Sequence, residues 1–307
     1  MNQEFTIRVE AIVNNVRRVV VANPEVIKLS LLGLLCQGHV LLDDLPGVGK
    51  TLLAKSLAQS VHGSFKRIQF TPDLLPTDIT GSSIYNQTNG DFKFLPGPIF
   101  ANIVLADEIN RSSPRTQSAL LEAMGEGFVT FDGTTYPLPK PFFVIATRNF
   151  SESHGVFPLP QSQLDRFLLS FGIGYPGQAE EVEILERHEH GEPQISPVIT
   201  AEDVSLMQSQ VLQVKVARPV KEYIARIIAE TRASPELATG VSPRGAVALQ
   251  RAAQARAAMA GRDFATPDDV KAVALPVMRH RIVVRASEPD AASNYLKEVL
   301  STVPVPL

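Results

Sequence analysis

The chain has 307 residues, of which 44% are hydrophobic and 20% are charged. These values are near the average for globular proteins, exclude a disordered chain and leave room for one large domain or two ordinary ones. A net charge of −3 gives no basic surplus, which argues against nucleic acid as the main partner, and the single cysteine, Cys36, excludes a disulfide within the chain.

Neither the start of the chain nor its most apolar stretch has the pattern of a targeting or membrane segment. Residues 1–4 lack the basic start and the apolar run of a signal peptide. Residues 27–42 are the most apolar, but Lys28, Gln37 and His39 interrupt them, and the stretch is too short to span a bilayer. We therefore predict a cytoplasmic protein without membrane insertion.

In chain order, helix patterns first alternate with strand patterns. Apolar residues at helical spacing predict a helix over 5–21, Pro24 marks the start of a second helix, and residues 51–61 are helical in pattern. Three continuous apolar runs, typical of strands buried on both faces of a parallel sheet, lie at residues 39–42, 103–106 and 142–145. This alternation predicts an α/β domain.

Two turn sequences predict β-hairpins inserted into this pattern. Asn89-Gly90 predicts a hairpin near 82–95, and Asp132-Gly133 predicts a second near 126–138. Both residues of such a turn need a positive φ, which these residue types adopt readily.

After Pro176 the strand runs stop. Residues 221–231 and 246–260 are helical in pattern, and Thr266 begins a further helix as an N-cap followed by proline and two acids. We predict a domain boundary near Pro176, with an α/β core over residues 1–176 and a small all-helical domain over 177–307.

The strongest motif is the glycine-rich segment between the first predicted strand and the helix over 51–61. This context is typical of a P-loop, in which glycines turn backbone N–H groups toward phosphates at a helix N-terminus. Lys50 is expected to contact the β- and γ-phosphates, and the Thr51 hydroxyl to ligate Mg²⁺. The predicted ATP-binding set is Pro46, Gly47, Val48, Gly49, Lys50, Thr51 and Leu52. The alternative is a glycine-rich turn without a ligand.

The first glycine of the usual P-loop pattern is replaced by Asp44. Asp enters left-handed backbone conformations more readily than most residues. We therefore expect the loop to keep its shape with Asp44 in such a conformation.

Two later strands deliver polar residues to the same edge of the predicted sheet. The strand over 103–106 ends in Asp107 and Glu108. Asp107 is predicted to hold Mg²⁺ through water, and Glu108 to orient and polarise the attacking water. Asn149 follows the strand over 142–145, and its amide is predicted to position that water. The alternatives are acids that cap a strand and an asparagine that forms a turn.

Several longer segments resemble the MoxR family of AAA+ ATPases, the helix 2 insert type. Besides the P-loop, they are Gln69–Pro76, Gly97–Asn102, Asp107–Arg111, Thr116–Met124 and Leu164–Phe167. The resemblance runs from about residue 23 to about residue 281. It implies a P-loop NTPase core, with a parallel sheet flanked by helices, followed by a helical lid.

The resemblance also implies roles for single residues. Asn149 is similar to the sensor 1 residue, Arg166 to the arginine finger and Arg244 to the sensor 2 arginine of the lid. An arginine finger stabilises charge on the γ-phosphoryl oxygens and contributes on the order of 10³–10⁵ in rate. The alternative for both arginines is a surface ion pair, and Asp165 is a candidate partner for Arg166. The two hairpins resemble the helix 2 insert and the pre-sensor 1 hairpin, which face a central pore.

We therefore expect an ATP-hydrolysing, Mg²⁺-dependent, chaperone-like motor that forms a homo-oligomeric ring, a hexamer. The resemblance alone implies a client protein with a von Willebrand factor A domain. Two alternatives are an AAA+ subunit that acts on nucleic acid and a nucleotide-sensing scaffold. The acidic charge balance disfavours the first, and the presence of Lys50, Asp107, Glu108 and Arg166 disfavours the second.

Overall fold

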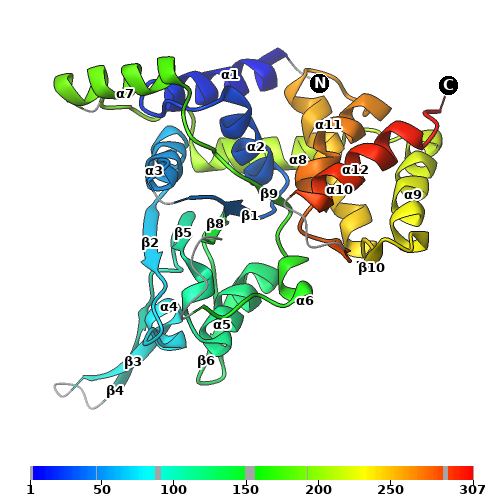
Figure 1. The fold of residues 1–307 in the computed structure, drawn as a ribbon. Coiled ribbons are helices and arrows are strands. Elements are labelled where there is room, and N and C mark those ends of the chain that lie inside the picture. The colour runs from blue at the N-terminus through cyan, green and yellow to red at the C-terminus, as the bar shows by residue number, and fades with distance from the viewer. Residues whose placement is uncertain are drawn as a thin grey trace.

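A five-stranded parallel sheet forms the centre of the N-terminal part (Figure 1). The computed structural model describes residues 3–45, 47–86, 91–148, 156–191, 193–285 and 290–306. The strand order is β2-β5-β8-β1-β9. The strands are β1 (Val40–Asp43), β2 (Phe65–Gln69), β5 (Ile103–Asp107), β8 (Phe143–Arg148) and β9 (Leu169–Phe171). The three predicted strands are confirmed, and β2 and β9 are additional strands at the two edges.

The central strands are buried on both faces. Alternate residues of a strand point to opposite faces, so Leu42 and Leu105 join one hydrophobic cluster while Leu41 and Val104 join another. The first cluster includes helices α1 (Gln3–Arg17), α2 (Pro24–Leu35) and α3 (Lys50–Ser60). The second includes α5 (Pro114–Glu126). Short helices α4 (Pro76–Thr80), η1 (Ile109–Arg111) and α6 (Gln161–Leu164) connect the strands.

Both predicted hairpins are present. They are β3 (Gly81–Asn86) with β4 (Asp91–Pro96), and β6 (Phe128–Phe131) with β7 (Thr134–Pro137). The second turn has the expected positive φ at Asp132 and Gly133, whereas Asn89-Gly90 lies outside the described residues. Phe94 of β4 stacks on Tyr136 of β7 with ring centroids 4.2 Å apart, so the two hairpins lie side by side (Figure 1).

The C-terminal part is helical, as predicted, apart from one short antiparallel ladder. The helices are α7 (Gln178–His190), α8 (Ala201–Leu212), α9 (Arg218–Ala233), α10 (Pro243–Met259), α11 (Pro267–Met278) and α12 (Ala291–Thr302). The ladder joins β10 (Leu237–Thr239) to β11 (Val283–Val284). Residues of α8 and α10 belong to the same hydrophobic cluster as those of α1 and α2.

Residues 172–177, between β9 and α7, have no regular secondary structure, and the domain boundary near Pro176 stays a prediction. Within the described ranges, none of the helices combines the length and the hydropathy that crossing a membrane requires.

Candidate nucleotide site

The glycine-rich segment forms a left-handed turn between β1 and α3. Gly47 and Gly49 have φ values of 84° and 88°, and a Cβ added at either would meet nothing within 4 Å. Glycine is therefore required there for backbone conformation and not for lack of space. Gly49 caps α3 without a side-chain hydrogen bond, which leaves the first N–H groups of that helix available for an anion. Pro46 lies outside the described residues.

A cavity of about 370 Å³ opens in front of this turn. It brings together most of the residues predicted to bind phosphate and metal. Its walls are Gly47, Gly49, Lys50, Thr51, Leu52, Arg67, Gln69, Asp107 and Glu108. The Lys50 Nζ rests on the loop backbone, where it donates to the carbonyl oxygens of Leu45 at 3.0 Å and Asp44 at 3.4 Å. The cavity therefore combines a cationic side, a hydroxyl and two carboxylates at one edge of the sheet.

Asp44 does not have the left-handed conformation that we expected, so that prediction is wrong. Its side chain has a different use. The carboxylate accepts the N–H of Leu45 at 2.9 Å, that of Gly174 at 3.0 Å and that of Ile173. Asp44 thus holds the segment that follows β9 against the P-loop.

Asp107 ends β5 and Glu108 follows it, and both are fixed by a residue that sequence reasoning missed. The buried Thr147 hydroxyl donates to Asp107 Oδ1 at 2.6 Å and accepts the N–H of Glu108 at 2.8 Å. The sheet register pairs Ala106 with Ala146, which places Thr147 beside Asp107. Glu108 has a φ of 57°, a left-handed conformation that is uncommon for a non-glycine residue and is secured here by this bond.

Basic side chains of the same chain contact both carboxylates. Arg67 of β2 pairs with Asp107 Oδ2 at 2.6 Å. Arg111 pairs with Glu108 Oε2 at 3.0 Å, and Gln69 donates to the same oxygen at 2.8 Å. The two carboxylates are therefore charge-balanced within the chain, and a metal or a water molecule has to compete with Arg67 and Arg111.

A second cavity of about 700 Å³ shares Gly47, Gly49 and Leu52 with the first. Most of its other lining residues are apolar and come from the segment before α2 and the segment after β9, and α7 adds Glu180, Ile184, Arg187 and His188. The residues of the two segments include Val19, Val20, Val21, Ala22, Ile173, Gly174, Tyr175 and Pro176. An apolar slot joined to a phosphate cradle has the form that a purine nucleotide requires. Apart from the P-loop residues, no local sequence motif predicts this slot.

The remaining predicted residues lie elsewhere or are not described. Asn149 falls outside the described residues. Arg166 follows α6 and donates to the carbonyl oxygen of Leu121 at 2.6 Å, while Arg244 is exposed in the first turn of α10. Neither arginine lines either cavity.

The ion-pair alternatives for these two arginines are not supported. In the part of the chain that the structure describes, neither Arg166 nor Arg244 forms an ion pair. Asp165 pairs with Arg281 at 2.8 Å, so the idea that Asp165 is the partner of Arg166 is wrong.

The chain is similar to ATPases along its whole length. Residues 39–169 match the ATPase family associated with various cellular activities (AAA), and residues 229–300 match the AAA lid domain. The chain is 49% identical to YeaC of Bacillus subtilis over 96% of this chain and 94% of that protein. It is 40% identical to chaperone MoxR1 of Mycobacterium tuberculosis over 97% of this chain and 82% of that protein.

A solved structure agrees with the fold. The crystal structure of a Cytophaga hutchinsonii protein described as an ATPase matches with a TM-score of 0.92 at 36% identity. The match covers 99% of this chain and 96% of that one.

Proposed function

Because this chain belongs to the MoxR family of AAA+ ATPases, we propose that it hydrolyses ATP as one subunit of a homo-oligomeric ring, a hexamer, that remodels a client protein. ATP hydrolysis and a chaperone-type activity follow from the family. The ring, the site residues and the client are the proposed parts. The observation that carries the site is the single cavity lined by Lys50, Thr51, Asp107 and Glu108.

ATP binds across the two joined cavities. The adenine ring lies in the apolar slot beside Val20 and Ile173, and the phosphates lie on the turn of Gly47 and Gly49. Lys50 leaves the loop carbonyl oxygens that it now contacts and follows the phosphate charge. Lys50 thereby exchanges hydrogen bonds to two neutral carbonyl oxygens for contacts with charged phosphate oxygens.

The oxygen donors fit Mg²⁺. Thr51 and Asp107 line the same cavity, and hydroxyl, carboxylate and water oxygens are the donors that Mg²⁺ prefers beside phosphates. Bound Mg²⁺ would supply positive charge for the oxygens of the β- and γ-phosphates. Arg67 has to leave Asp107 for that carboxylate to act, whereas Thr147 keeps the carboxylate oriented throughout.

Glu108 orients the attacking water and accepts its proton. Thr147 holds its backbone, and Arg111 and Gln69 hold its carboxylate in the free chain. Asn149, the next residue in the sequence after β8, lies outside the described residues, and we propose from the family resemblance that it contacts the same water. Glu108 is therefore the residue whose loss stops hydrolysis while nucleotide binding continues.

The site is completed by a neighbouring subunit. Arg166 lines neither cavity of its own chain and forms no ion pair within the described residues. We assign it as the arginine finger of the adjacent site, where it stabilises charge on the γ-phosphoryl oxygens. Arg244, on the first turn of α10, acts as the lid arginine of its own site.

The test is the specific ATPase rate as a function of protein concentration, with light scattering to follow assembly. The rate should rise as the protein assembles. Arg166→Ala should lower it on the order of 10³-fold while ATP still binds. Arg218→Ala removes an exposed arginine of α9 and is the matched control, which should behave as the unmodified protein. A rate that is independent of concentration and unchanged in Arg166→Ala overturns the shared site.

For the client, we propose a protein with a von Willebrand factor A domain. The support is the family alone, since no residue of the chain specifies that domain. The Glu108→Gln ring, loaded with ATP, should retain a purified protein of this kind, and the same ring without nucleotide should release it. Equal retention in both states counts against a nucleotide-driven client. A cytoplasmic location stays a prediction from the sequence.

A further inference from the structure

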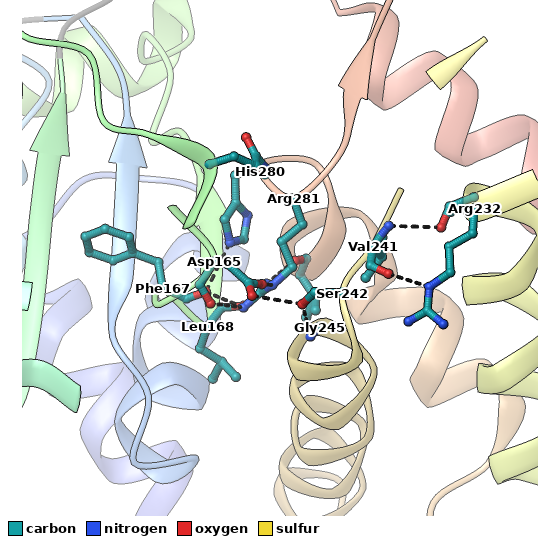
Figure 2. A network of polar contacts seen from close by, with 12 residues as sticks. Asp165, Phe167, Leu168, Arg232, Val241, Ser242, Gly245, His280 and Arg281 are labelled. Atoms are coloured by element: carbon teal, nitrogen blue, oxygen red, sulfur yellow. Dashed lines mark hydrogen bonds and ion pairs between the residues drawn. The ribbon is translucent and has the colours of Figure 1, made fainter. Parts of the chain in front are cut away.

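A buried polar network joins the C-terminal helices to the segment that carries Arg166 (Figure 2). Arg281, just after α11, is only 3% exposed. Its Nε donates to Asp165 Oδ1 at 2.8 Å and its Nη1 donates to the carbonyl oxygen of Leu168 at 3.0 Å. The neighbouring His280 contacts the carbonyl oxygen of Phe167 through Nε2 at 3.0 Å. Residues 165–168 are thus held from several sides by the end of α11.

The two carboxylate oxygens of Asp165 are used by two different elements. Oδ1 accepts from Arg281, and Oδ2 accepts from the Ser242 hydroxyl at 2.8 Å. Ser242 is also the N-cap of α10, where its oxygen accepts the N–H of Gly245 at 3.1 Å. Gly245 lies against Arg281, because a Cβ added there would come within 2.9 Å of the arginine Cδ. Asp165, α10 and the end of α11 are therefore one packed unit.

Among the described residues, Asp165 is the only carboxylate that forms an ion pair with Arg281. Burial lowers the pKa of Arg281 to about 10, and the Asp165 carboxylate opposes that shift, so the guanidinium stays charged near pH 7. A buried cation is tolerated only when it is paired and hydrogen-bonded. A movement of α10 and α11 that left Asp165 behind would strand this cation, so the segments are expected to move together.

The network lies between two residues of the proposed mechanism. Asp165 immediately precedes Arg166, and Ser242 precedes Arg244 by two residues. We propose that Asp165 is a positioning residue that couples the lid at one nucleotide site to the arginine finger offered to the next. The proposal rests on the roles proposed for Arg166 and Arg244. When Arg244 engages nucleotide, α10 moves with Ser242, and Asp165 carries that movement to Arg166.

The test is amide hydrogen exchange of the full chain, with and without a non-hydrolysable ATP analogue and Mg²⁺. Binding of the nucleotide should change the rate of amide hydrogen exchange in two peptides together, one over residues 164–168 and one over residues 243–249. Ser242→Ala removes the hydroxyl that joins them, and should keep the change over 243–249 but lose it over 164–168. Ser242→Thr keeps a hydroxyl and should show the nucleotide-dependent change in both peptides.

A matched control separates coupling from helix capping. Thr200→Ala removes the N-cap of α8, which accepts the N–H of Asp203 and does not contact Asp165. It should leave the response over 164–168 unchanged. In ATPase assays, Ser242→Ala should lower kcat on the order of five- to tenfold, with ATP affinity within about twofold. Thr200→Ala should change neither. Asp165→Asn should show the same loss of coupling, together with a lower melting temperature, because Arg281 then lacks its counter-ion.

Two results overturn the proposal. One is a nucleotide response over 164–168 that persists in Ser242→Ala, and the other is no such response in the unmodified protein. Failure of the proposed function is recognised separately, because it is absence of ATPase activity in the unmodified protein. The exchange measurement needs only nucleotide binding.

Discussion

Replacing Asp44 by glycine restores the usual P-loop pattern, yet we expect it to damage this protein. The carboxylate accepts the N–H groups of Leu45, Ile173 and Gly174. Asp44 is 9% exposed, so water replaces the lost oxygens only in part. Because Asp44 has no positive φ, glycine gains no conformational advantage there and only adds freedom to the unfolded chain.

The size of the effect follows from the three contacts. Hydrogen bonds to a charged group make a net contribution of about 1.5–3 kcal/mol each to stability when they are buried. Residues 173 and 174 are accessible to solvent, which lowers this value. We therefore count about 1 kcal/mol for each of the three hydrogen bonds that the Asp44 carboxylate accepts. With an unfolding entropy of about 2.1 cal/mol/K per residue, a loss of about 3 kcal/mol corresponds to roughly 5 °C in melting temperature for a chain of 307 residues.

The assay is thermal unfolding combined with equilibrium binding of a fluorescent ATP analogue. Asp44→Gly should unfold at a lower temperature and bind the ATP analogue several-fold more weakly, because Ile173 and Gly174 line the apolar slot. Asp44→Asn keeps one acceptor oxygen in the same place, so its melting temperature and its affinity for the ATP analogue should both fall less. An Asp44→Gly protein that melts no earlier than the unmodified chain and binds as tightly would refute the role of the carboxylate.

Three further predictions concern single side chains. Thr147→Val keeps the shape of the side chain but removes both hydrogen bonds to the carboxylate pair. It should lower kcat roughly ten- to hundredfold with ATP affinity kept, as steady-state assays and equilibrium binding will show. Burial raises the pKa of Cys36 to about 12, so iodoacetamide at pH 8 should label this thiol only after unfolding, as mass spectrometry will show. Burial lowers the pKa of His39 to about 4, whereas an unfolded histidine titrates near 6.5, so stability is complete above about pH 6.5 and falls as the pH drops toward 4. The loss at pH 5 should be about 2 kcal/mol in urea unfolding, and His39→Gln should remove that part of the pH dependence.

The central strands could be read from the sequence because burial on both faces leaves a continuous apolar run. Strand β2 lies at the edge, where Ile68 is its only buried residue, and β9 has three residues, so neither left such a run. The first helix was predicted to reach Val21 but ends at Arg17. The apolar pattern continues past the end of the helix because Val19 and Val20 line the apolar slot and do not belong to a helix face.

Some residues of the candidate site could likewise be predicted from the sequence, and others could not. Lys50 and Thr51 were identified because they begin the helix after the glycine-rich turn, and Asp107 and Glu108 because they stand at the end of a buried strand. The structure brings all four to one cavity. Thr147 was missed because its importance depends on the register of β5 against β8, which no local pattern encodes. The apolar slot was missed because its walls come from segments that are distant in sequence.

The most informative contacts are those between carboxylates near the nucleotide edge and partners late in the chain. Asp43 Oδ2 lies 3.8 Å from Arg279 Nη2, Asp44 accepts the N–H of Ile173, 129 residues away, and Asp165 pairs with Arg281, 116 residues away. Burial of a carboxylate is tolerated only when such partners are in place. The nucleotide edge therefore keeps its geometry only while the later segments are docked on it. Substitutions at these carboxylates should consequently act on turnover through the arrangement of the two parts of the chain, and their effects should not add independently to those of substitutions at Ser242 or Arg281.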